Sequence, residues 1–173
     1  MRHILRPDLY PLPVEAIKAL SLGKLTLRGK SVALVAPNGS GKTSNCIAPA
    51  ILYFLTCFPR GQVPVTSSSW MQVEKQLFPA LRRYMDNPFF SGWTFNKTEI
   101  RTPEGGFAVG FSTDNAGRAE GWHPKISPDV DPVFYVLDEA KTIPDSIFTA
   151  VSRCTLFHAF ITSSPGADSG TFY

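Results

Sequence analysis

The sequence has 173 residues, of which 43% are hydrophobic and 18% are charged. This length suits one domain of ordinary globular composition. The formal net charge of +3 comes without a dense run of lysine and arginine, so charge alone does not indicate a nucleic-acid partner. The spacing of Cys46, Cys57 and Cys154 argues against a zinc site or a disulfide framework. No apolar run is long enough to span a membrane and the N-terminus lacks a signal-peptide core, which predicts a cytoplasmic protein.

The first predicted elements are helices and a short apolar strand. The pattern over Pro13 to Leu22 predicts a helix, which Gly23 closes. Ser31 to Val35 is almost entirely apolar, as in a strand that is covered on both faces. Gly41 to Phe58 follows as a helix. Pro49 lacks an N–H donor, so it should kink or break that helix.

The middle of the chain predicts further alternation. Val63 to Thr66 has the composition of a short strand, and Trp70 to Tyr84 carries an apolar stripe with helical spacing. Pro79 predicts a kink or break within that helix. Trp93 to Arg101 and Phe107 to Ser112 are expected to form two strands across a turn of sequence Pro-Glu-Gly-Gly.

The last third contains the most apolar predicted strand. Asp114 to Asp131 has the composition of a loop, and Val133 to Leu137 that of a buried strand. A helix over Ser146 to Cys154 and a strand over Leu156 to Thr162 complete the pattern. Strands and helices that alternate in this way predict an α/β layered domain with a largely parallel sheet.

A glycine-rich segment lies between the first strand and the helix after it. Its residues are Ala36, Pro37, Asn38, Gly39, Ser40, Gly41, Lys42 and Thr43. The segment fits the phosphate-binding P-loop pattern, except that alanine replaces the first glycine. The glycines let the backbone N–H groups curl around a phosphate, Lys42 would reach the β- and γ-phosphates, and the Thr43 hydroxyl suits Mg²⁺. A chance Gly/Ser-rich turn is the alternative, which the strand before it and the helix after it disfavour.

Two adjacent carboxylates end the buried strand that begins at Val133. Asp138 would hold Mg²⁺ at the carboxyl end of the strand, where open α/β sheets bind their ligands. Glu139 would orient and polarise the attacking water. Acidic residues are also common where a strand meets solvent. Together with Lys42, however, this Walker B arrangement supplies both halves of a site for Mg²⁺ and a nucleoside triphosphate, most simply ATP.

The sequence resembles the ATPase domain of phage terminase large subunits, the motors that drive DNA into viral capsids. Four stretches carry the resemblance in the order of the family: the P-loop, Val65 to Val73, Gly121 to His123 with Asp138 to Ala140 downstream, and Ile161 to Gly166. The resemblance implies a P-loop NTPase fold of the RecA/ASCE type, with a mainly parallel sheet flanked by helices and incomplete at its C-terminal end.

The resemblance also implies roles for two polar segments. Thr162, Ser163 and Ser164 match the motif that couples the state of the γ-phosphate to movement, although an ordinary turn of this composition is the alternative. Val65 to Ser69 would face DNA or a neighbouring subunit. Gln72 matches the family pattern as well, but the sequence indicates no physical role for it.

Two departures from the family concern the nucleotide. The stretch from Tyr10 to Ala16, where similar ATPases have an adenine-reading glutamine, contains none, which leaves adenine specificity open. The P-loop contains no arginine. Phosphoryl transfer spreads charge over the γ-phosphate oxygens, so we expect Arg118 to act as a catalytic finger that is donated to a neighbouring subunit. A solvated loop charge is the alternative for Arg118.

A third departure is length. Family members carry a C-terminal nuclease domain, whereas this chain ends at Tyr173 without a later carboxylate cluster, so we expect a single truncated ATPase domain over residues 1–173 and no nuclease activity. The expected function is Mg²⁺-dependent ATP hydrolysis that powers DNA packaging in the host cytoplasm. The expected partners are double-stranded DNA, other terminase subunits including further copies of this chain, and the capsid portal, but no membrane. A catalytically silent fragment and a superfamily 2 helicase-type fragment are the alternatives.

Overall fold

The computed structural model of the protein describes residues 15–16, 18–19, 30–114, 117–126, 130–154 and 157–166. Of the helix predicted over residues 13–22, the described residues 15–16 and 18–19 are helical, and the rest of it lies outside the described residues. Most of the stretch at residues 10–16 and the end of the chain at Tyr173 also lie outside them. Within the described part, no helix is both long enough and apolar enough to cross a membrane.

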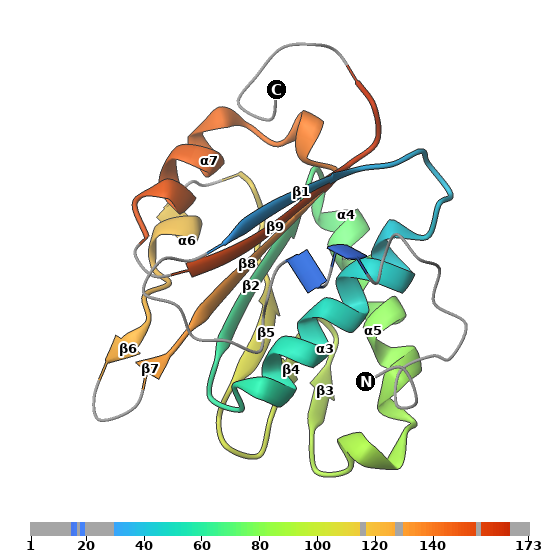
Figure 1. Cartoon of the computed structure of the whole chain (residues 1–173), viewed down its shortest axis with the longest axis vertical. Coiled ribbons are helices and arrows are strands. Elements are labelled where there is room, and N and C mark those ends of the chain that lie inside the picture. Colours follow the sequence, from blue (N-terminus) through green and yellow to red (C-terminus); the bar gives the residue numbers. More distant parts are fainter. Residues whose placement is uncertain are drawn as a thin grey trace.

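A seven-stranded sheet, in the order β1-β9-β8-β2-β5-β4-β3, forms the centre of the fold (Figure 1). Its parallel strands are β1 (Ser31–Val35), β2 (Gln62–Ser67), β5 (Phe107–Gly110), β8 (Val133–Asp138) and β9 (Phe157–Ser163). At one edge, β3 (Thr94–Asn96) and β4 (Glu99–Arg101) are antiparallel. The short strands β6 (Lys125–Ile126) and β7 (Val130–Asp131) form a separate antiparallel pair. The predicted, largely parallel α/β sheet is confirmed.

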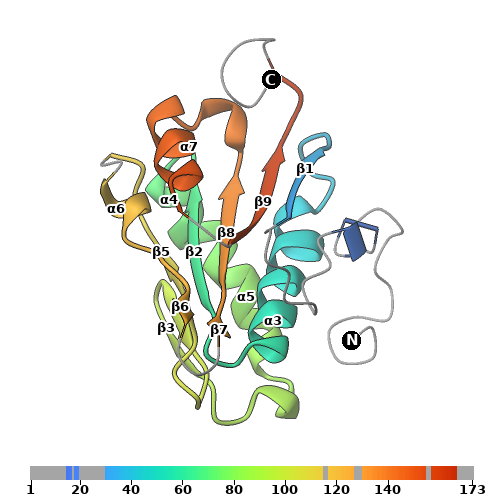
Figure 2. The ribbon, with the colours of Figure 1, turned by 60° about the vertical axis from the view of Figure 1, so that its left-hand side comes forward.

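Helices cover both faces of the sheet (Figure 2). The helices are α3 (Ala48–Cys57), α4 (Trp70–Gln72), α5 (Phe78–Met85), α6 (Gly117–Glu120) and α7 (Asp145–Ser152). Side chains alternate along β8, so Phe134 and Val136 pack with α3 and α5, whereas Tyr135 and Leu137 pack with α6 and α7. Each fully buried apolar side chain of this kind contributes roughly 1.5–3 kcal/mol. The result is a three-layer arrangement whose two cores lie on opposite faces of one sheet.

Neither of the two prolines that were predicted to kink or break a helix ends it, and each follows a change of helix type. A π-helical turn, Lys42–Ile47, leads into α3 just before Pro49, and a second one, Val73–Leu77, leads into α5 just before Pro79. In a π-helical pattern the N–H five residues after Ser44 would bond its carbonyl, and Pro49 has no such N–H. The hydroxyl of Tyr84 donates a 2.9 Å hydrogen bond to the Ser44 carbonyl instead. The helix after the P-loop therefore continues past the proline and is fastened there to α5.

The prediction that Ser31 to Val35 is covered on both faces is wrong. Within the described ranges β1 pairs only with β9, and the side chain positions alternate so that Leu34 is buried while Val35 is 52% exposed. An apolar run does not show whether both faces of a strand are covered, because the elements that pack over those faces come from distant parts of the chain.

Two other predicted segments differ from the structure. Trp93 to Arg101 is not one strand but the hairpin of β3 and β4, in which Phe95 pairs with Ile100 across a tight turn at residues 97–98. The turn contains neither glycine nor proline, so the sequence does not mark it. The supposed loop from Asp114 to Asp131 contains α6 and the β6–β7 pair, elements too short to give a periodic pattern.

Candidate nucleotide-binding site

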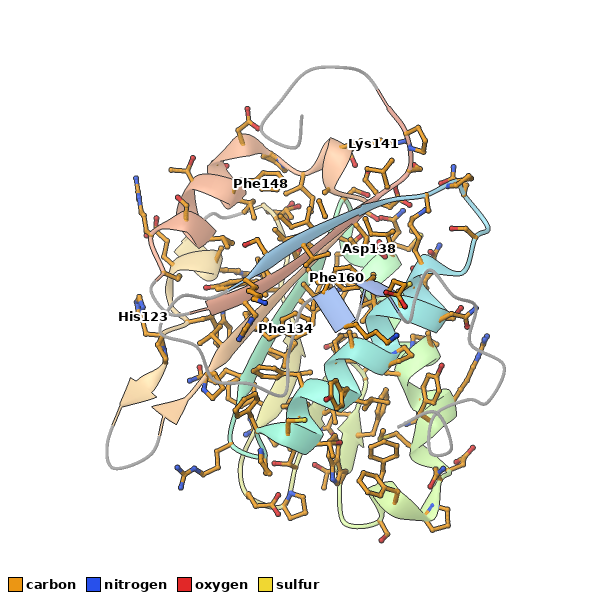
Figure 3. The ribbon with its side chains drawn as sticks, in the orientation of Figure 1. His123, Phe134, Asp138, Lys141, Phe148 and Phe160 are labelled. Atoms are coloured by element: carbon orange, nitrogen blue, oxygen red, sulfur yellow. The ribbon has the colours of Figure 1, made fainter. Side chains whose placement is uncertain are left out.

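The candidate site lies where the parallel strands end. In the sheet register Val35 of β1 pairs with Ser163 of β9, and Ser67 of β2 pairs with Asp138 of β8. The P-loop, the acidic pair and the predicted coupling residues therefore meet at one edge of the sheet. Figure 3 shows Asp138 and Lys141 toward this end, whereas His123 lies beside the amino end of β2, where its carbonyl accepts a hydrogen bond from Gln62.

The P-loop is held in shape by its glycines and by Lys42. Gly39 and Gly41 have φ angles of +76° and +78°, a left-handed backbone that glycine adopts without steric cost. The base of the loop is fixed to the sheet because Ala36 donates its N–H to the carbonyl of Ser163 at 3.0 Å. The ammonium group of Lys42 donates to the carbonyls of Ala36 at 2.9 Å and of Pro37 at 3.1 Å. Asn38 and Ser40 are exposed at the loop tip. The loop thus presents curled backbone amides and a fixed cation to the same space.

Asp138 is a buried carboxylate with a full set of donors. Its Oδ1 accepts from the Thr162 hydroxyl at 2.6 Å and from the N–H of Glu139 at 3.0 Å, and its Oδ2 accepts from the Thr43 hydroxyl at 3.0 Å. Burial raises the pKa of Asp138, and the hydrogen bonds from Thr162, Thr43 and the Glu139 N–H act in the opposite direction. The contact between Thr43 and Asp138 joins the two halves of the site.

The donor set at Thr43 and Asp138 fits a magnesium ion. Both ligand atoms are oxygens, as hard cations prefer, and they lie 3.0 Å apart. Neighbouring ligands of an octahedral Mg²⁺ with bonds of about 2.1 Å are also about 3 Å apart. Among the described residues there is no cluster of three or more acids, histidines or cysteines. Such an ion would therefore take its remaining ligands from water and phosphate, which is how Mg²⁺ is usually held.

Glu139 spans the gap between the P-loop and β9. Its Oε1 lies 3.7 Å from the Lys42 ammonium nitrogen, and its Oε2 accepts from the hydroxyl of Ser164 at 3.1 Å and from the N–H of Ser164 at 3.4 Å. The backbone of Glu139 has a φ angle of +50°, in the left-handed region that non-glycine residues seldom adopt. The carboxylate is thus held beside the P-loop cation.

A cleft of about 750 Å³ opens over these groups. One side is the P-loop with Lys42 and Thr43, and Glu139 lines it as well. The other side is the helical face that carries Gln72, Lys75 and Arg83, among others. The cleft is therefore lined by amides and cations with a single carboxylate, which suits a ligand rich in negative oxygens.

Most of the predicted site residues come together, but Arg118 does not join them within its own chain. Arg118 lines a second cleft of about 660 Å³ with Trp70 and Trp122, and its carbonyl accepts a 2.9 Å hydrogen bond from the Trp122 indole. An arginine finger that serves a neighbouring subunit has to lie outside the nucleotide cleft of its own chain, and Arg118 does so. The assignment of Arg118 to that role stays a prediction.

Sequence reasoning noted Gln72 without a role and assigned no site role to Lys141, Lys75 or Arg83, all of which line the cleft. Lys141 donates from its ammonium group to the Ser164 hydroxyl at 2.7 Å, and its N–H donates to the Ser163 hydroxyl at 3.2 Å. Gln72 lies across the cleft on α4. A lysine just after an acidic pair carries no distinctive spacing. Gln72 does have a signal, because Ser69 three residues earlier makes the capping-box pattern.

The fold was compared with those of known proteins. No protein-family model and no curated protein matches the sequence. Among solved structures, a large terminase from a thermophilic bacteriophage superposes with a TM-score of 0.64 at 10% identity, over 91% of this chain and 39% of the terminase. The Thermus phage P74-26 large terminase ATPase domain superposes with a TM-score of 0.55 at 18% identity, over 95% of this chain and 72% of that one.

The chain has the fold of a large-terminase ATPase domain. This P-loop NTPase-like fold is the one that the sequence motifs predict, with a mostly parallel sheet flanked by helices. Another structure of the thermophilic-phage terminase is a complex with ADP, and it superposes on this chain with a TM-score of 0.58 at 10% identity, over 86% of this chain and 38% of the terminase. The chain spans about two fifths of the length of that terminase.

Proposed function

We propose that this chain binds ATP together with Mg²⁺ and hydrolyses it as the motor domain of a DNA-packaging terminase. The observation that carries the proposal is the meeting of two distant segments at one point. Thr43 of the P-loop lies 3.0 Å from Asp138, and Lys42 lies 3.7 Å from Glu139. An adenine nucleotide is supported by the ADP complex of the thermophilic-phage terminase, which shares this fold.

Phosphate binding falls to the P-loop. The amides around Gly39 and Gly41, together with the amino end of the following helix, would surround the β-phosphate, and Lys42 would bind the β- and γ-phosphates. Lys42 is only 6% exposed and already makes two hydrogen bonds to loop carbonyls. Because these bonds fix the side chain before a ligand arrives, little conformational entropy is lost on binding.

Metal binding falls to Thr43 and Asp138. The ion they would hold supplies charge neutralisation of the phosphates when it is bound. Asp138 is kept in place for this task by Thr162 and by the N–H of Glu139. With these bonds in place, Oδ2 of Asp138 faces Thr43, while Oδ1 is bonded to Thr162 of β9 and to the N–H of Glu139.

Hydrolysis requires a group that orients the attacking water, and Glu139 is our candidate. Its carboxylate can accept a hydrogen bond from a water near the terminal phosphate, which aligns the water for in-line attack. Ser164 holds one oxygen of this carboxylate and leaves the other toward Lys42. The position of Glu139 therefore depends on the end of β9.

The end of β9 also offers a route for coupling. Thr162 bonds Asp138, Ser163 bonds the base of the P-loop through its carbonyl, and Ser164 bonds Glu139. A change in the terminal phosphate that moves either acid would alter these bonds and shift the end of β9. We assign Thr162, Ser163 and Ser164 to coupling on this ground, with DNA, the capsid portal and further terminase subunits as the partners of the complete motor in the infected host.

The test combines two substitutions with nucleotide binding and single-turnover ATP hydrolysis, with and without double-stranded DNA. Lys42→Ala should weaken binding of Mg²⁺-ATP by about 10- to 100-fold, because it removes a charged hydrogen-bond donor. Glu139→Gln should keep binding and lower the hydrolysis rate by about 10²- to 10⁴-fold, because it removes the water-orienting carboxylate. Glu99→Gln on β4, far from the cleft, is the matched control and should hydrolyse at the parent rate.

Each unexpected outcome would contradict a different part of the proposal. Hydrolysis by Glu139→Gln at the parent rate would show that the water is oriented by another group. Binding of Mg²⁺-ATP without turnover by the parent protein, in the presence of DNA, would favour the silent fragment. Failure of the parent protein to bind nucleotide would refute the proposal as a whole.

A further inference from the structure

The turn after β2 holds a glutamine in an unusual way. Ser69 is the N-cap of α4 and accepts a hydrogen bond from the N–H of Gln72, as in a capping box. In that motif the side chain at the position of Gln72 normally bonds the N–H of the cap residue. Here the Gln72 carbonyl oxygen instead accepts from the hydroxyls of Ser67 at 2.8 Å and Ser68 at 2.5 Å. The side chain therefore reaches back past the cap to the end of β2.

This attachment fixes the glutamine beside the acidic pair. Ser67 is only 2% exposed and is the register partner of Asp138 on the neighbouring strand β8. Gln72 lines the same cleft as Lys42 and Glu139. The end of β2 thus carries a polar side chain into the cleft from the wall opposite the P-loop, at the strand next to the one that bears the acids.

The anchored amide has only donors left to offer. A primary amide oxygen accepts two hydrogen bonds, and the hydroxyls of Ser67 and Ser68 use both. The amide nitrogen has two N–H groups, which make no hydrogen bond to any of the described residues. Lys75 and Arg83 follow on the same helical face and line the same cleft, and they are donors as well. Gln72, Lys75 and Arg83 therefore suit an anion with several acceptor oxygens.

We propose that the Gln72 amide nitrogen donates a hydrogen bond to the terminal phosphate of a bound nucleoside triphosphate, so that Gln72 is a positioning residue that distinguishes a triphosphate from a diphosphate. The inference rests on the proposed function, because it assigns the ligand of Gln72 to the nucleotide of the same cleft. In the proposed binding mode the P-loop would hold the β-phosphate, and the terminal phosphate would lie toward Glu139, which lines the cleft beside Lys42. A donor fixed to the end of β2, next to the strand that ends at Asp138, would then meet the terminal phosphate rather than the β-phosphate.

A capping role alone makes a different prediction for Gln72→Glu. Glutamate is as suitable as glutamine in the capping box, and its carboxylate accepts from Ser67 and Ser68 equally well. It has no N–H to donate and would bring a negative charge toward the phosphate. Gln76→Glu adds the same charge about one turn along the same cleft and controls for its long-range effect.

The experiment is a calorimetric titration of the full chain with Mg²⁺ and either ADP or a non-hydrolysable ATP analogue, with thermal unfolding measured in parallel. In Gln72→Glu we expect the parent melting temperature and a fall of about tenfold or more in the ratio of analogue affinity to ADP affinity, the size of effect that loss of one charged hydrogen bond has. Gln76→Glu should lower both affinities by similar factors and keep the ratio within about twofold, since its charge acts at longer range.

Four results overturn the inference. A parent-like affinity ratio in Gln72→Glu leaves Gln72 as a helix cap only, and so does a ratio that falls equally in Gln76→Glu. If Gln72→Glu does not fold, Gln72→Met removes the donor without a charge, and an unchanged ratio there has the same meaning. If the parent protein binds neither nucleotide, the proposed function fails and the inference fails with it. The two failures can be told apart. If the parent protein binds both nucleotides and Gln72→Glu binds them in the parent ratio, only the inference about Gln72 fails.

Discussion

Replacing Thr162 by valine isolates one contact between β9 and the acidic pair. Thr162 is fully buried, and its 2.6 Å hydrogen bond to Asp138 is shorter than the 3.0 Å bond from Thr43. Loss of a hydrogen bond to a charged group costs about 1.5–3 kcal/mol, and burial of the new methyl group returns about 0.8 kcal/mol. We therefore expect Thr162→Val to lower the free energy of unfolding by about 1–2 kcal/mol.

The assay is urea denaturation of the nucleotide-free chain, followed by circular dichroism. With a urea dependence of about 2 kcal/mol per molar, the midpoint should fall by about 0.5–1 M in Thr162→Val. Thr43→Val should shift it less, because Thr43 is half-buried and water can replace its hydroxyl. Thr162→Ser keeps the donor and should lie between Thr162→Val and the parent. A midpoint in Thr162→Val that falls no further than in Thr43→Val would refute the reasoning, since the buried contact must be the stronger one.

Two further predictions concern a buried histidine and the P-loop glycines. Burial lowers the pKa of His158 below its ordinary 6.5, so the unfolded state takes up the proton first and the free energy of unfolding should fall as pH decreases from 7.5 to 5.5. His158→Asn keeps an acceptor and should show a smaller fall in urea midpoint over this range, and an equal fall would contradict the prediction. Gly41→Ala and Gly39→Ala both place a Cβ on a left-handed backbone, at a cost of about 1–2 kcal/mol each. Only at Gly41 does the added Cβ meet a neighbouring atom, the side-chain amide nitrogen of Asn45 at 2.6 Å, so Asn45 must turn away. Gly41→Ala should therefore lose more Mg²⁺-ATP affinity than Gly39→Ala in a titration, and equal affinities would show that the loop tolerates the shift.

The chemistry of the site could be predicted from sequence because it depends on local identity. Glycines before Lys42 and two acids after an apolar strand indicate their roles without knowledge of distant contacts. That the two halves meet also follows from the sequence, since the carboxyl ends of parallel strands share one edge of a sheet. The 3.0 Å contact between Thr43 and Asp138 shows that the two halves do meet.

The features that the sequence did not reveal depend on contacts between distant segments. Whether Val35 is covered is decided by what packs over that face of β1, and the sequence of the strand itself does not show this. The hairpin at Phe95 was not predicted because neither glycine nor proline marks its turn. The setting of Gln72 needs β2 and β8 in register, and the predicted role of Arg118 would need a second subunit.

The left-handed backbone at Glu139 has a consequence for how such a chain can change over time. A glycine at this position would relieve about 1 kcal/mol of steric strain and would remove the carboxylate with it. Structural robustness and turnover therefore favour different amino acids at residue 139. Under the proposed function, a chain that hydrolyses nucleotide has to carry this strain, whereas a chain that only binds nucleotide would be more stable with glycine at residue 139.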